Sequence, residues 1–387
     1  MKHVLCAFCD MEEDILREIF RCGREYGWLV EYSPRTIYPD WSGDGVITDY
    51  LRLEELRRIA NFRNTPIVSR ELPPRGNIRT VHTDTTLVAA MVINYIESRG
   101  FQNVAIAGNR KWPGELDGVA QDPGEPFEQL ARERGLNLFR CYWAPNLYYN
   151  EQESYRLILE TLERFFREIP KPTALFVKRR IHLNIIYRVL EKIGLKVPEE
   201  IAILCNSVSP LIAENAMVPT TYVSGEMRQV GMLLADTLRR MMDGEHLPEE
   251  PIRIAPDAII TRRSTDVFVV PHLKLKKALN FFQENAFSNI GVADGAAAAG
   301  LSTSMLNRLF RRYLHQSALD YLRELRLNRI RHLLAESDLT LTEIAAQTGY
   351  SSKIALSAAF RASGGMSPGA NRKKTSPQSE QGKFLLE

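Results

Sequence analysis

The sequence AAAAGLS at residues 296–302 has a counterpart, AAQTGYS, at residues 345–351, so the pattern A-x-x-x-G-x-S occurs twice. In each copy the first alanine would let two helices cross closely, and the glycine would supply the positive φ of a tight turn. The serine would cap the following helix. Each copy therefore predicts a helix-turn-helix unit. One copy alone would be a common pattern, and the repetition makes the prediction specific.

A long helix is predicted between the two copies. Apolar residues recur at helical spacing from residue 318 to 334, which predicts a helix of ~18 residues and ~27 Å. This length is comparable to one turn of DNA, ~34 Å, so the second helices of both units could enter adjacent major grooves. The arginines of this segment could contact phosphates or solvent: Arg323, Arg326, Arg329 and Arg331.

The charge of the chain is unevenly distributed. The net charge of all 387 residues is only +3. Residues 271–387 hold 16 Lys and Arg against 9 Asp and Glu, a net charge of +7, whereas residues 1–270 hold 34 against 38, a net charge of −4. A basic carboxyl-terminal part on an acidic body is typical of a nucleic-acid-binding module joined to a domain with another task.

The first 270 residues alternate short apolar runs, such as 4–8 and 104–107, with amphipathic helical patterns. Continuous apolar strands between helices predict parallel strands that are buried on both faces. We therefore predict an α/β fold of two doubly wound lobes, followed by an all-α double helix-turn-helix domain. The predicted parts are residues 1–270, residues 271–374 and a disordered tail at residues 375–387.

The composition argues against several classes of protein. No apolar run approaches the ~20 residues of a membrane span, and the amino terminus does not have the form of a secretory signal. Five scattered cysteines favour a reducing compartment, the cytoplasm, and the pair Cys6 and Cys9 is interpreted as part of a buried strand. We find no metal-ligand cluster, Gly-rich phosphate loop or paired acid and base. We therefore expect no metal site, no cofactor and no catalytic residues.

The carboxyl-terminal part resembles the DNA-binding domain of AraC-family regulators. The resemblance covers residues 276–372 and is carried by GLSTSMLNRLFRRYL, LDYLRELRLNRIRHLL and LTEIAAQTGYSSKIALSAAFRASGGMSPGANR. It implies that both recognition helices contact double-stranded DNA, with Arg311 and Arg312 favouring the backbone. The candidate DNA-binding residues are Ser302, Thr303, Ser304, Asn307, Arg308, Arg311, Arg312, Ser352, Lys353, Ser357 and Arg361.

The chain departs from the AraC-family pattern at several positions. Gly295 stands where an apolar residue is usual, and Ile354-Ala355-Leu356 replaces a Ser-Tyr-Phe-like run. Ala358 and Asn371 stand where a basic residue and a tyrosine are common. Because the second unit has few polar side chains able to read bases, we expect it to position the protein, with sequence reading concentrated in the first unit.

The first 270 residues resemble the effector domain of LacI-type repressors, which is shared with periplasmic sugar-binding proteins. The stretches that carry this resemblance include WSGDGVIT, TPIVSREL, VHTDTTLVAAMVINYIESRGFQNVAIAG, PTALFVKRR and IGLKVPEEIAILCNS. The order of the two parts is that of the xylose-regulator group of the AraC family. Such sheets bind ligands beyond the carboxyl ends of their strands. The candidate ligand-binding residues are Asp10, Asn109, Arg180 and Asn206.

The nature of the ligand remains open at this point. Arg180 and Asn206 stand where sugar-binding members of the family carry aspartate, and residues 178–180 are all cations. These changes favour an anionic ligand, such as a sugar acid or sugar phosphate, over a neutral pentose. Alternatively, the cations face solvent and the pocket is degenerate.

The leading hypothesis is a homodimeric transcription regulator of carbohydrate metabolism, controlled by a sugar-like effector, with RNA polymerase as a further candidate partner and no membrane association. One alternative is a ligand-independent DNA-binding regulator whose amino-terminal domain serves dimerisation or a protein partner. An α/β enzyme ranks below both.

Overall fold

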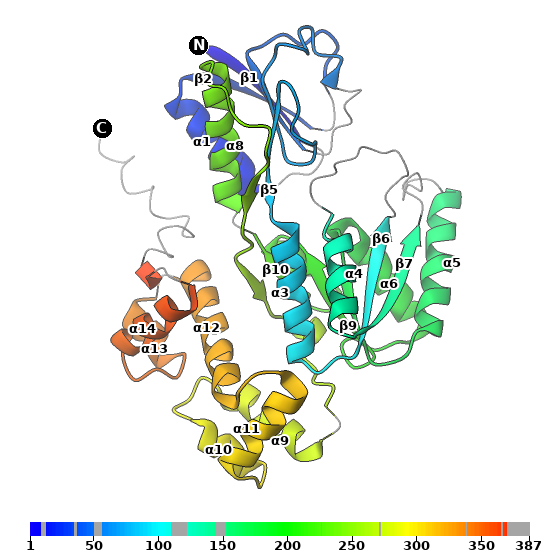
Figure 1. The fold of residues 1–387 in the computed structure, drawn as a ribbon, viewed down its shortest axis with the longest axis vertical. Helices are drawn as coiled ribbons and strands as arrows, with labels where there is room; N and C mark the ends of the chain where they lie inside the picture. The colour runs from blue at the N-terminus through cyan, green and yellow to red at the C-terminus, as the bar shows by residue number, and fades with distance from the viewer. Residues whose placement is uncertain are drawn as a thin grey trace. The chain divides into compact units, whose positions relative to one another are not determined.

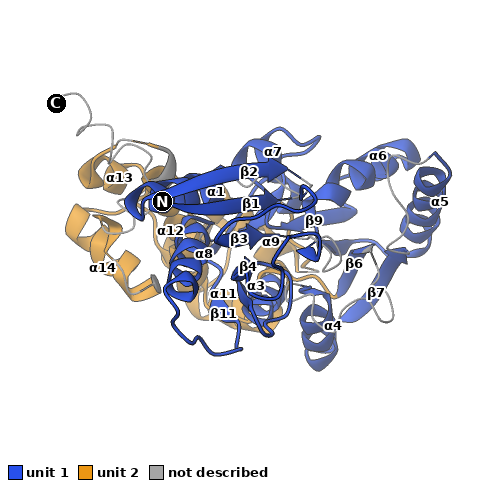
Figure 2. Cartoon of the chain, turned by 90° about the horizontal axis from the view of Figure 1, so that it is seen from above, with its two compact units in different colours: residues 1–94, 103–265 blue, residues 95–102, 266–387 orange. Residues whose placement is uncertain are grey.

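The computed structural model describes residues 1–8, 13–34, 37–49, 56–109, 122–143, 152–225, 227–270, 272–337, 339–364 and 367–369. Asp10, Cys9 and the predicted tail lie outside these residues. The chain divides into two compact units (Figure 2). The first holds residues 1–94 and 103–265, and the second holds residues 95–102 and 266–387.

The first unit contains two sheets, and the first sheet has the strand order β11-β5-β4-β3-β1-β2, with all neighbours parallel. Its strands are β1 (Lys2–Phe8), β2 (Trp28–Pro34), β3 (Gly45–Thr48), β4 (Ile67–Ser69), β5 (Ile78–Thr83) and β11 (Ile252–Ile254). Helices α1 (Glu13–Glu25) and α8 (Met227–Met242) contribute to the core on one face. In β1, Val4 and Cys6 belong to this core, and Leu5 belongs to the core on the other face.

Burial of β1 residues on both faces of the sheet explains the unbroken apolar sequence of this strand. Cys6 is fully buried, and this burial raises the pKa of its thiol. The interpretation of Cys6 as part of a buried strand is confirmed.

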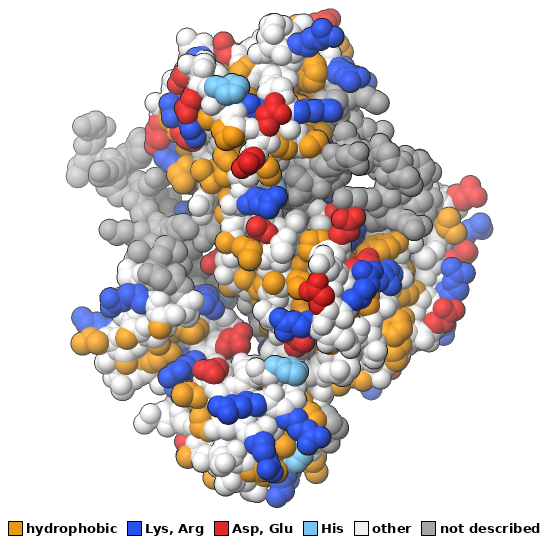
Figure 3. Space-filling model, viewed as in Figure 1, with side chains coloured by type: hydrophobic (Ala, Val, Ile, Leu, Met, Phe, Trp, Pro, Cys, Tyr) orange, Lys and Arg blue, Asp and Glu red, His pale blue; other side chains and the backbone are white. Residues whose placement is uncertain are grey.

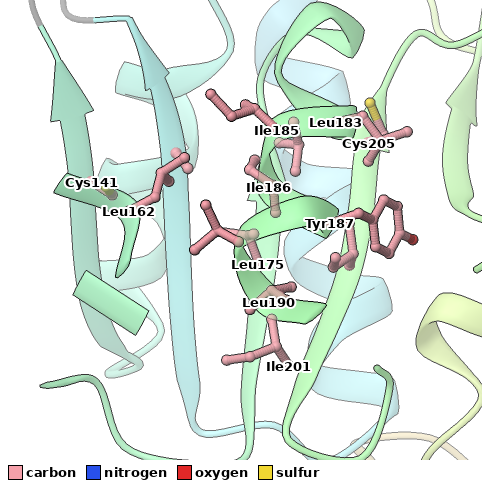
Figure 4. Packing of buried hydrophobic residues seen from close by; sticks show 14 of the residues in the cluster. Cys141, Leu162, Leu175, Leu183, Ile185, Ile186, Tyr187, Leu190, Ile201 and Cys205 are labelled. Carbon is pink, nitrogen blue, oxygen red and sulfur yellow. The ribbon is translucent and has the colours of Figure 1, made fainter. Parts of the chain in front are cut away.

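The second sheet has the strand order β12-β10-β9-β8-β6-β7, in which only β12 is antiparallel to its described neighbour. Its strands are β6 (Asn103–Asn109), β7 (Asn137–Trp143), β8 (Thr173–Val177), β9 (Ile201–Asn206), β10 (Thr221–Ser224) and β12 (Ala258–Ile260). Helix α3 (Thr85–Ser98) precedes β6, and α4 (Gly124–Glu133), α5 (Gln152–Glu168), α6 (Leu183–Ile193) and α7 (Pro210–Glu214) lie between successive strands. Short 3-10 turns are present at Arg180–His182, after β8, and at Arg263–Thr265, after β12. In Figure 4, Ile186 and Leu190 of α6 lie beside Leu175 of β8 and Ile201 of β9.

The chain passes between the two sheets three times: after β5, after β10 and between β11 and β12. Each sheet is therefore built from distant parts of the sequence. The predicted α/β fold with two parallel, doubly wound lobes is confirmed.

The second unit contains the helices of the carboxyl-terminal part (Figure 1). They are α9 (Leu273–Asn285), α10 (Val292–Ala298), α11 (Thr303–Leu314), α12 (Ala318–Glu336), α13 (Leu341–Ala346) and α14 (Lys353–Gly364). They enclose two hydrophobic cores. Helix α12 belongs to both, because Tyr321 and Leu322 pack in the core with α9–α11, and Ile330 and Leu334 pack in the core with α13 and α14. The predicted all-α region and its long connecting helix are confirmed.

Residues 95–102, at the end of α3 and beyond, also belong to the second unit. The guanidinium carbon of Arg99 lies 5.1 Å from the ring centre of Tyr95 and 4.7 Å from that of Phe268. The backbone N–H of Val269 donates to the Arg99 carbonyl at 2.9 Å. Two cation–π contacts of this kind stabilise a buried arginine. Helix α3 thus begins in the first unit and ends in the second.

Gly295 is enclosed by the ring of Phe282. A Cβ atom at position 295 would lie 2.2, 2.5 and 2.8 Å from three carbons of that ring. Phe282 is fully buried and packs against the rings of Phe310 and Tyr321, at centroid distances of 6.0 and 6.2 Å. The aromatic ring therefore occupies the space that an apolar side chain at position 295 would fill.

Arg326 connects the two helix-turn-helix units. Its Nε donates to the carbonyl of Ala286 at 2.7 Å, and its Nη2 donates to the carbonyls of Ser288 at 3.0 Å and Ile290 at 2.9 Å. Its guanidinium carbon lies 5.8 Å from the ring centre of Tyr350. The side chain therefore joins the segment before α10 to the turn after α13. Arg326 was expected to contact phosphates or solvent; it remains partly exposed, but its guanidinium group is bound by these carbonyl groups.

We predict that Gly295→Ala destabilises the second unit by about 1–3 kcal/mol, because the added methyl group overlaps Phe282. At an ordinary helix position the same change stabilises by about 1 kcal/mol. Urea unfolding followed by circular dichroism measures the effect. Ala297→Gly, at an exposed position of the same helix, is the control and should follow helix propensity alone. A stabilised Gly295→Ala variant would contradict the overlap.

We predict that Arg326→Ala lowers the free energy of unfolding by on the order of 2 kcal/mol, because three carbonyl groups lose a charged donor. Arg323→Ala is the matched control. Arg323 is exposed on the same helix and only weakly paired with Asp320, at 3.6 Å, so its loss should cost no more than about 0.5 kcal/mol. Equal unfolding midpoints for the two variants in urea would show that Arg326 does not hold the units together.

Candidate nucleic-acid interface and ligand site

The leading end of α11 is exposed. Ser302 caps the helix, since its Oγ accepts the N–H of Met305 at 3.2 Å, and Thr303 and Ser304 follow it at the surface. On the opposite side, Leu306 and Phe310 are fully buried. Helix α11 therefore presents short polar side chains at its amino end and anchors itself by its apolar face.

The longer polar side chains of α11 differ in their availability. Asn307 is half-buried: its Nδ2 donates to the carbonyl of Thr303 at 3.1 Å, and its Oδ1 accepts the N–H of Ala318 at 3.1 Å. Its amide thus joins α11 to the start of α12. Arg308, Arg311 and Arg312 are exposed. The Nη2 of Arg308 lies 2.8 Å from the Sδ of Met305 on the preceding turn.

The second recognition helix, α14, has the same exposed leading end. Ser352 caps it, because its Oγ accepts the N–H of Ala355 at 3.2 Å. The repeat predicted the preceding serine, Ser351, as this cap, and that prediction is wrong by one residue. Lys353 and Arg361 are exposed, and Ser357 is half-buried.

The two recognition helices correspond at a spacing of 50 residues. The caps Ser302 and Ser352 and the buried pairs Leu306 with Leu356 and Phe310 with Phe360 all share this spacing. The turn glycines, Gly300 with φ +60° and Gly349 with φ +72°, are only 49 residues apart, so the second turn is one residue longer. Both glycines have the predicted positive φ.

Basic side chains are prominent on the surface of the helical unit. On the face drawn in Figure 3, more Lys and Arg than Asp and Glu side chains lie over this unit. The exposed arginines of α11 and the exposed Lys353 and Arg361 of α14 add positive charge along the two recognition helices. Such a distribution attracts the phosphate backbone of nucleic acids.

Three of the four predicted ligand-binding residues lie at one edge of the second sheet. Asn109 ends β6, Arg180 is the third residue after β8, and Asn206 ends β9. These three strands are neighbours in the sheet. Arg180 and Asn206 are half-buried, the side chain of Asn109 is not among those described, and Asp10 lies outside the described residues. The structure therefore brings three of the four predicted positions together.

Lys178, at the same edge, is an internal residue. Its Nζ lies 2.8 Å from Oδ2 of Asp122 and 5.1 Å from the ring centre of Tyr142, and its side chain is only 7% exposed. Its carbonyl accepts Nδ2 of Asn206 at 3.3 Å. A carboxylate thus already neutralises Lys178, and the case for an anionic ligand rests on Arg179 and Arg180. Sequence reasoning missed Asp122, which is 56 residues away.

Two buried rings lie beside this edge. The rings of Trp143, at the end of β7, and His182 meet edge to face at 4.8 Å between centroids. Burial lowers the pKa of His182 to about 3, and the cations Arg179 and Lys178 contribute to this shift. His182 is therefore neutral at physiological pH and adds no charge to the site.

Two further features are absent from the described part of the chain. None of its helices is long and apolar enough to cross a membrane. Among the same residues, no group of three or more His, Cys, Asp or Glu side chains is arranged to hold a metal ion.

Both parts of the chain match known protein families. A helix-turn-helix domain matches residues 296–374, and a periplasmic binding protein-like domain matches residues 93–265. The xylose operon regulatory protein of Escherichia coli strain K12 is 25% identical over 329 residues, which cover 81% of this chain and 79% of that protein.

Solved structures share the fold. A structure of the xylose-binding transcription activator XylR covers 97% of this chain and 99% of its own, with a TM-score of 0.58 and 20% identity. A periplasmic binding protein/LacI transcriptional regulator from Alkaliphilus metalliredigens QYMF, complexed with D-xylulofuranose, covers 68% of this chain and 99% of its own, with a TM-score of 0.52 and 15% identity.

The exposed recognition helices, the two parallel sheets and these matches lead to one conclusion. The chain is an AraC-type DNA-binding transcription regulator in which a helix-turn-helix region follows a periplasmic-binding-protein-like domain, and it is related to the xylose operon regulatory proteins.

Proposed function

We propose that this regulator controls genes of carbohydrate metabolism in response to a sugar, sugar acid or sugar phosphate bound by its first unit. The observation that carries the proposal is the convergence of Asn109, Arg180 and Asn206 at the carboxyl ends of adjacent strands. This edge is where open α/β sheets bind ligands. The similar LacI-type regulator that holds D-xylulofuranose supports a carbohydrate as the ligand class.

The chemistry of the edge defines which carbohydrates are candidates. Asn206 has an amide that can both donate to and accept from hydroxyl groups, and Arg180 can bind a carboxylate or phosphate through two N–H groups. The buried pair of Lys178 and Asp122 supplies no net charge. A ligand with hydroxyl groups and one anionic group therefore fits the edge.

The proposed action on DNA assigns different tasks to the side chains of α11. Thr303, Ser304 and Arg308 contact base edges or nearby phosphates, and Arg311 and Arg312 contact the phosphate backbone. We further propose that the protein acts in the cytoplasm as a homodimer, with RNA polymerase as a candidate partner. Ligand binding would change how the two DNA-binding domains of the dimer are presented, through the lobe closure usual for such domains.

We predict that one member of a panel of pentoses, hexoses and their acids and phosphates raises the thermal stability of the protein. A ligand at 100 times its Kd adds ~2.7 kcal/mol to the free energy of unfolding. Differential scanning fluorimetry measures the shift. If no carbohydrate in the panel stabilises the protein, while the protein still selects a DNA sequence, the ligand-independent alternative is favoured.

We predict that Arg180→Ala weakens binding of a sugar acid or sugar phosphate by about 10- to 100-fold, the loss expected for a hydrogen-bonded charge. Binding of the corresponding neutral sugar should change much less. Isothermal titration calorimetry compares the two ligands. Arg156→Ala is the control, since Arg156 is 72% exposed on α5. An equal loss for neutral and anionic ligands would exclude Arg180 as the anion-binding group.

We predict that Arg308→Ala weakens binding to selected DNA sites more than binding to random DNA, because a base contact is specific. Arg311→Ala and Arg312→Ala should weaken both alike and flatten the dependence of affinity on salt concentration, because phosphate contacts are unspecific. Titrations by fluorescence anisotropy at several salt concentrations test this. Equal losses on both kinds of DNA for Arg308→Ala would refute its role in base reading.

A further inference from the structure

An apolar side chain stands exposed at the leading end of the second recognition helix. Ile354 is the second residue of α14, and its relative exposure is 75%. The other large apolar residues of the helix, Leu356 and Phe360, are buried, with relative exposures of 0% and 4%. Ile354 therefore has no part in the core of the domain and is available for contact with another molecule.

The position of Ile354 corresponds to a predicted base-contacting position of the first helix-turn-helix unit. With the spacing of 50 residues set by the caps and by the buried leucines and phenylalanines, Ile354 matches Ser304 of α11. Ser304 is also exposed, directly after the amino-terminal residue of its helix. If α14 enters a major groove as α11 does, Ile354 reaches the level of the base edges.

Base edges offer one feature that suits an aliphatic side chain. In the major groove, hydrogen-bond donors and acceptors line every base pair, and the C5-methyl group of thymine is the apolar exception. Ile354 cannot donate or accept a hydrogen bond. Contact with a thymine methyl group would remove apolar surface of both partners from water, which is favourable.

The surroundings of Ile354 match those of a DNA contact. Lys353, directly before it, and Arg361, two turns later, are exposed cations on the same helix. These two cations would bind phosphates of the DNA while Ile354 faces the bases. The second helix-turn-helix unit has few polar side chains that could read bases, but an apolar contact with a base is open to it through Ile354.

We propose that Ile354 is a specificity-determining residue that selects thymine by contact with its C5-methyl group. This inference rests on the proposed docking of α14 in a major groove. The partner that Ile354 would contact is thus double-stranded DNA with a thymine in the half-site that the second helix-turn-helix unit covers.

The test uses the full-length protein and a DNA site that it has selected from a random pool, with and without the carbohydrates that stabilise it. Each thymine of the site is replaced in turn by deoxyuridine, which removes the methyl group and keeps all base-pair donors and acceptors. We expect one replacement to weaken binding by wild-type protein about 3- to 10-fold. Ile354→Ala should lose a similar factor on the thymine site and show no further loss on the uracil site.

The controls separate this contact from other effects. Leu319→Ala removes a 42% exposed leucine from α12 and should leave the response to deoxyuridine at its wild-type size. Uracil in the half-site of α11 should affect the wild type and Ile354→Ala equally. Because Ile354 is exposed, Ile354→Ala should fold as well as the wild type, and Ile354→Val should keep part of the thymine preference.

The outcomes are distinct. The proposal is supported if the effects of the uracil replacement and of Ile354→Ala are non-additive at one position. It is overturned if no single replacement distinguishes wild type from Ile354→Ala, or if Ile354→Ala binds the thymine site as tightly as the wild type does. Failure of wild-type protein to select any sequence would instead refute the proposed function itself, before Ile354 is tested.

Discussion

The contacts of Arg326 set the arrangement on which the DNA-binding unit depends. One guanidinium group binds the carbonyls of Ala286, Ser288 and Ile290 and covers the ring of Tyr350. Gly349 permits this approach, because a Cβ atom there would lie 2.7 Å from the carbonyl oxygen of Ser288. Helix α12 alone would fix the distance between the two helix-turn-helix units but leave the rotation of one relative to the other about the helix axis less constrained. The arginine and the glycine define that rotation, and with it the directions in which α11 and α14 face.

In the periplasmic-binding-protein-like part of the chain, the ion pair of Lys178 and Asp122 likewise joins distant segments, here at the edge of the second sheet. Lys178 and Asp122 are both largely buried, and a buried charge without its partner would be strongly destabilising. The pair therefore holds the segment at Asp122 against the end of β8 and, through the Lys178 carbonyl, orients Asn206. Asn206 and Arg180 are half-buried polar side chains at the same edge. The neutral pair of rings formed by Trp143 and His182 adds a rigid apolar neighbour to it.

Much of the architecture could be predicted because its signals are local. The alternation of apolar strands with helices, the paired turn glycines and the spacing of apolar residues in α12 are properties of neighbouring residues, and the structure bears them out. Contacts between distant residues were not predicted. Asn307 has the chemistry of a base-reading side chain, and its amide also joins α11 to α12. Arg326 has the chemistry of a phosphate ligand, but its guanidinium group binds backbone carbonyl groups. The shift of the second cap from Ser351 to Ser352 depends on how one turn packs.

The sequence by itself determined the fold class, the double helix-turn-helix and the families that the chain resembles, because periodicity and turn chemistry act within a few residues. The tertiary structure alone decided which polar side chains are free to meet DNA or a ligand. It paired Lys178 with a carboxylate 56 residues away, enclosed Gly295 under Phe282 and left Ile354 exposed at the end of α14. Availability depends on the partners that folding brings together, and no local pattern records those partners.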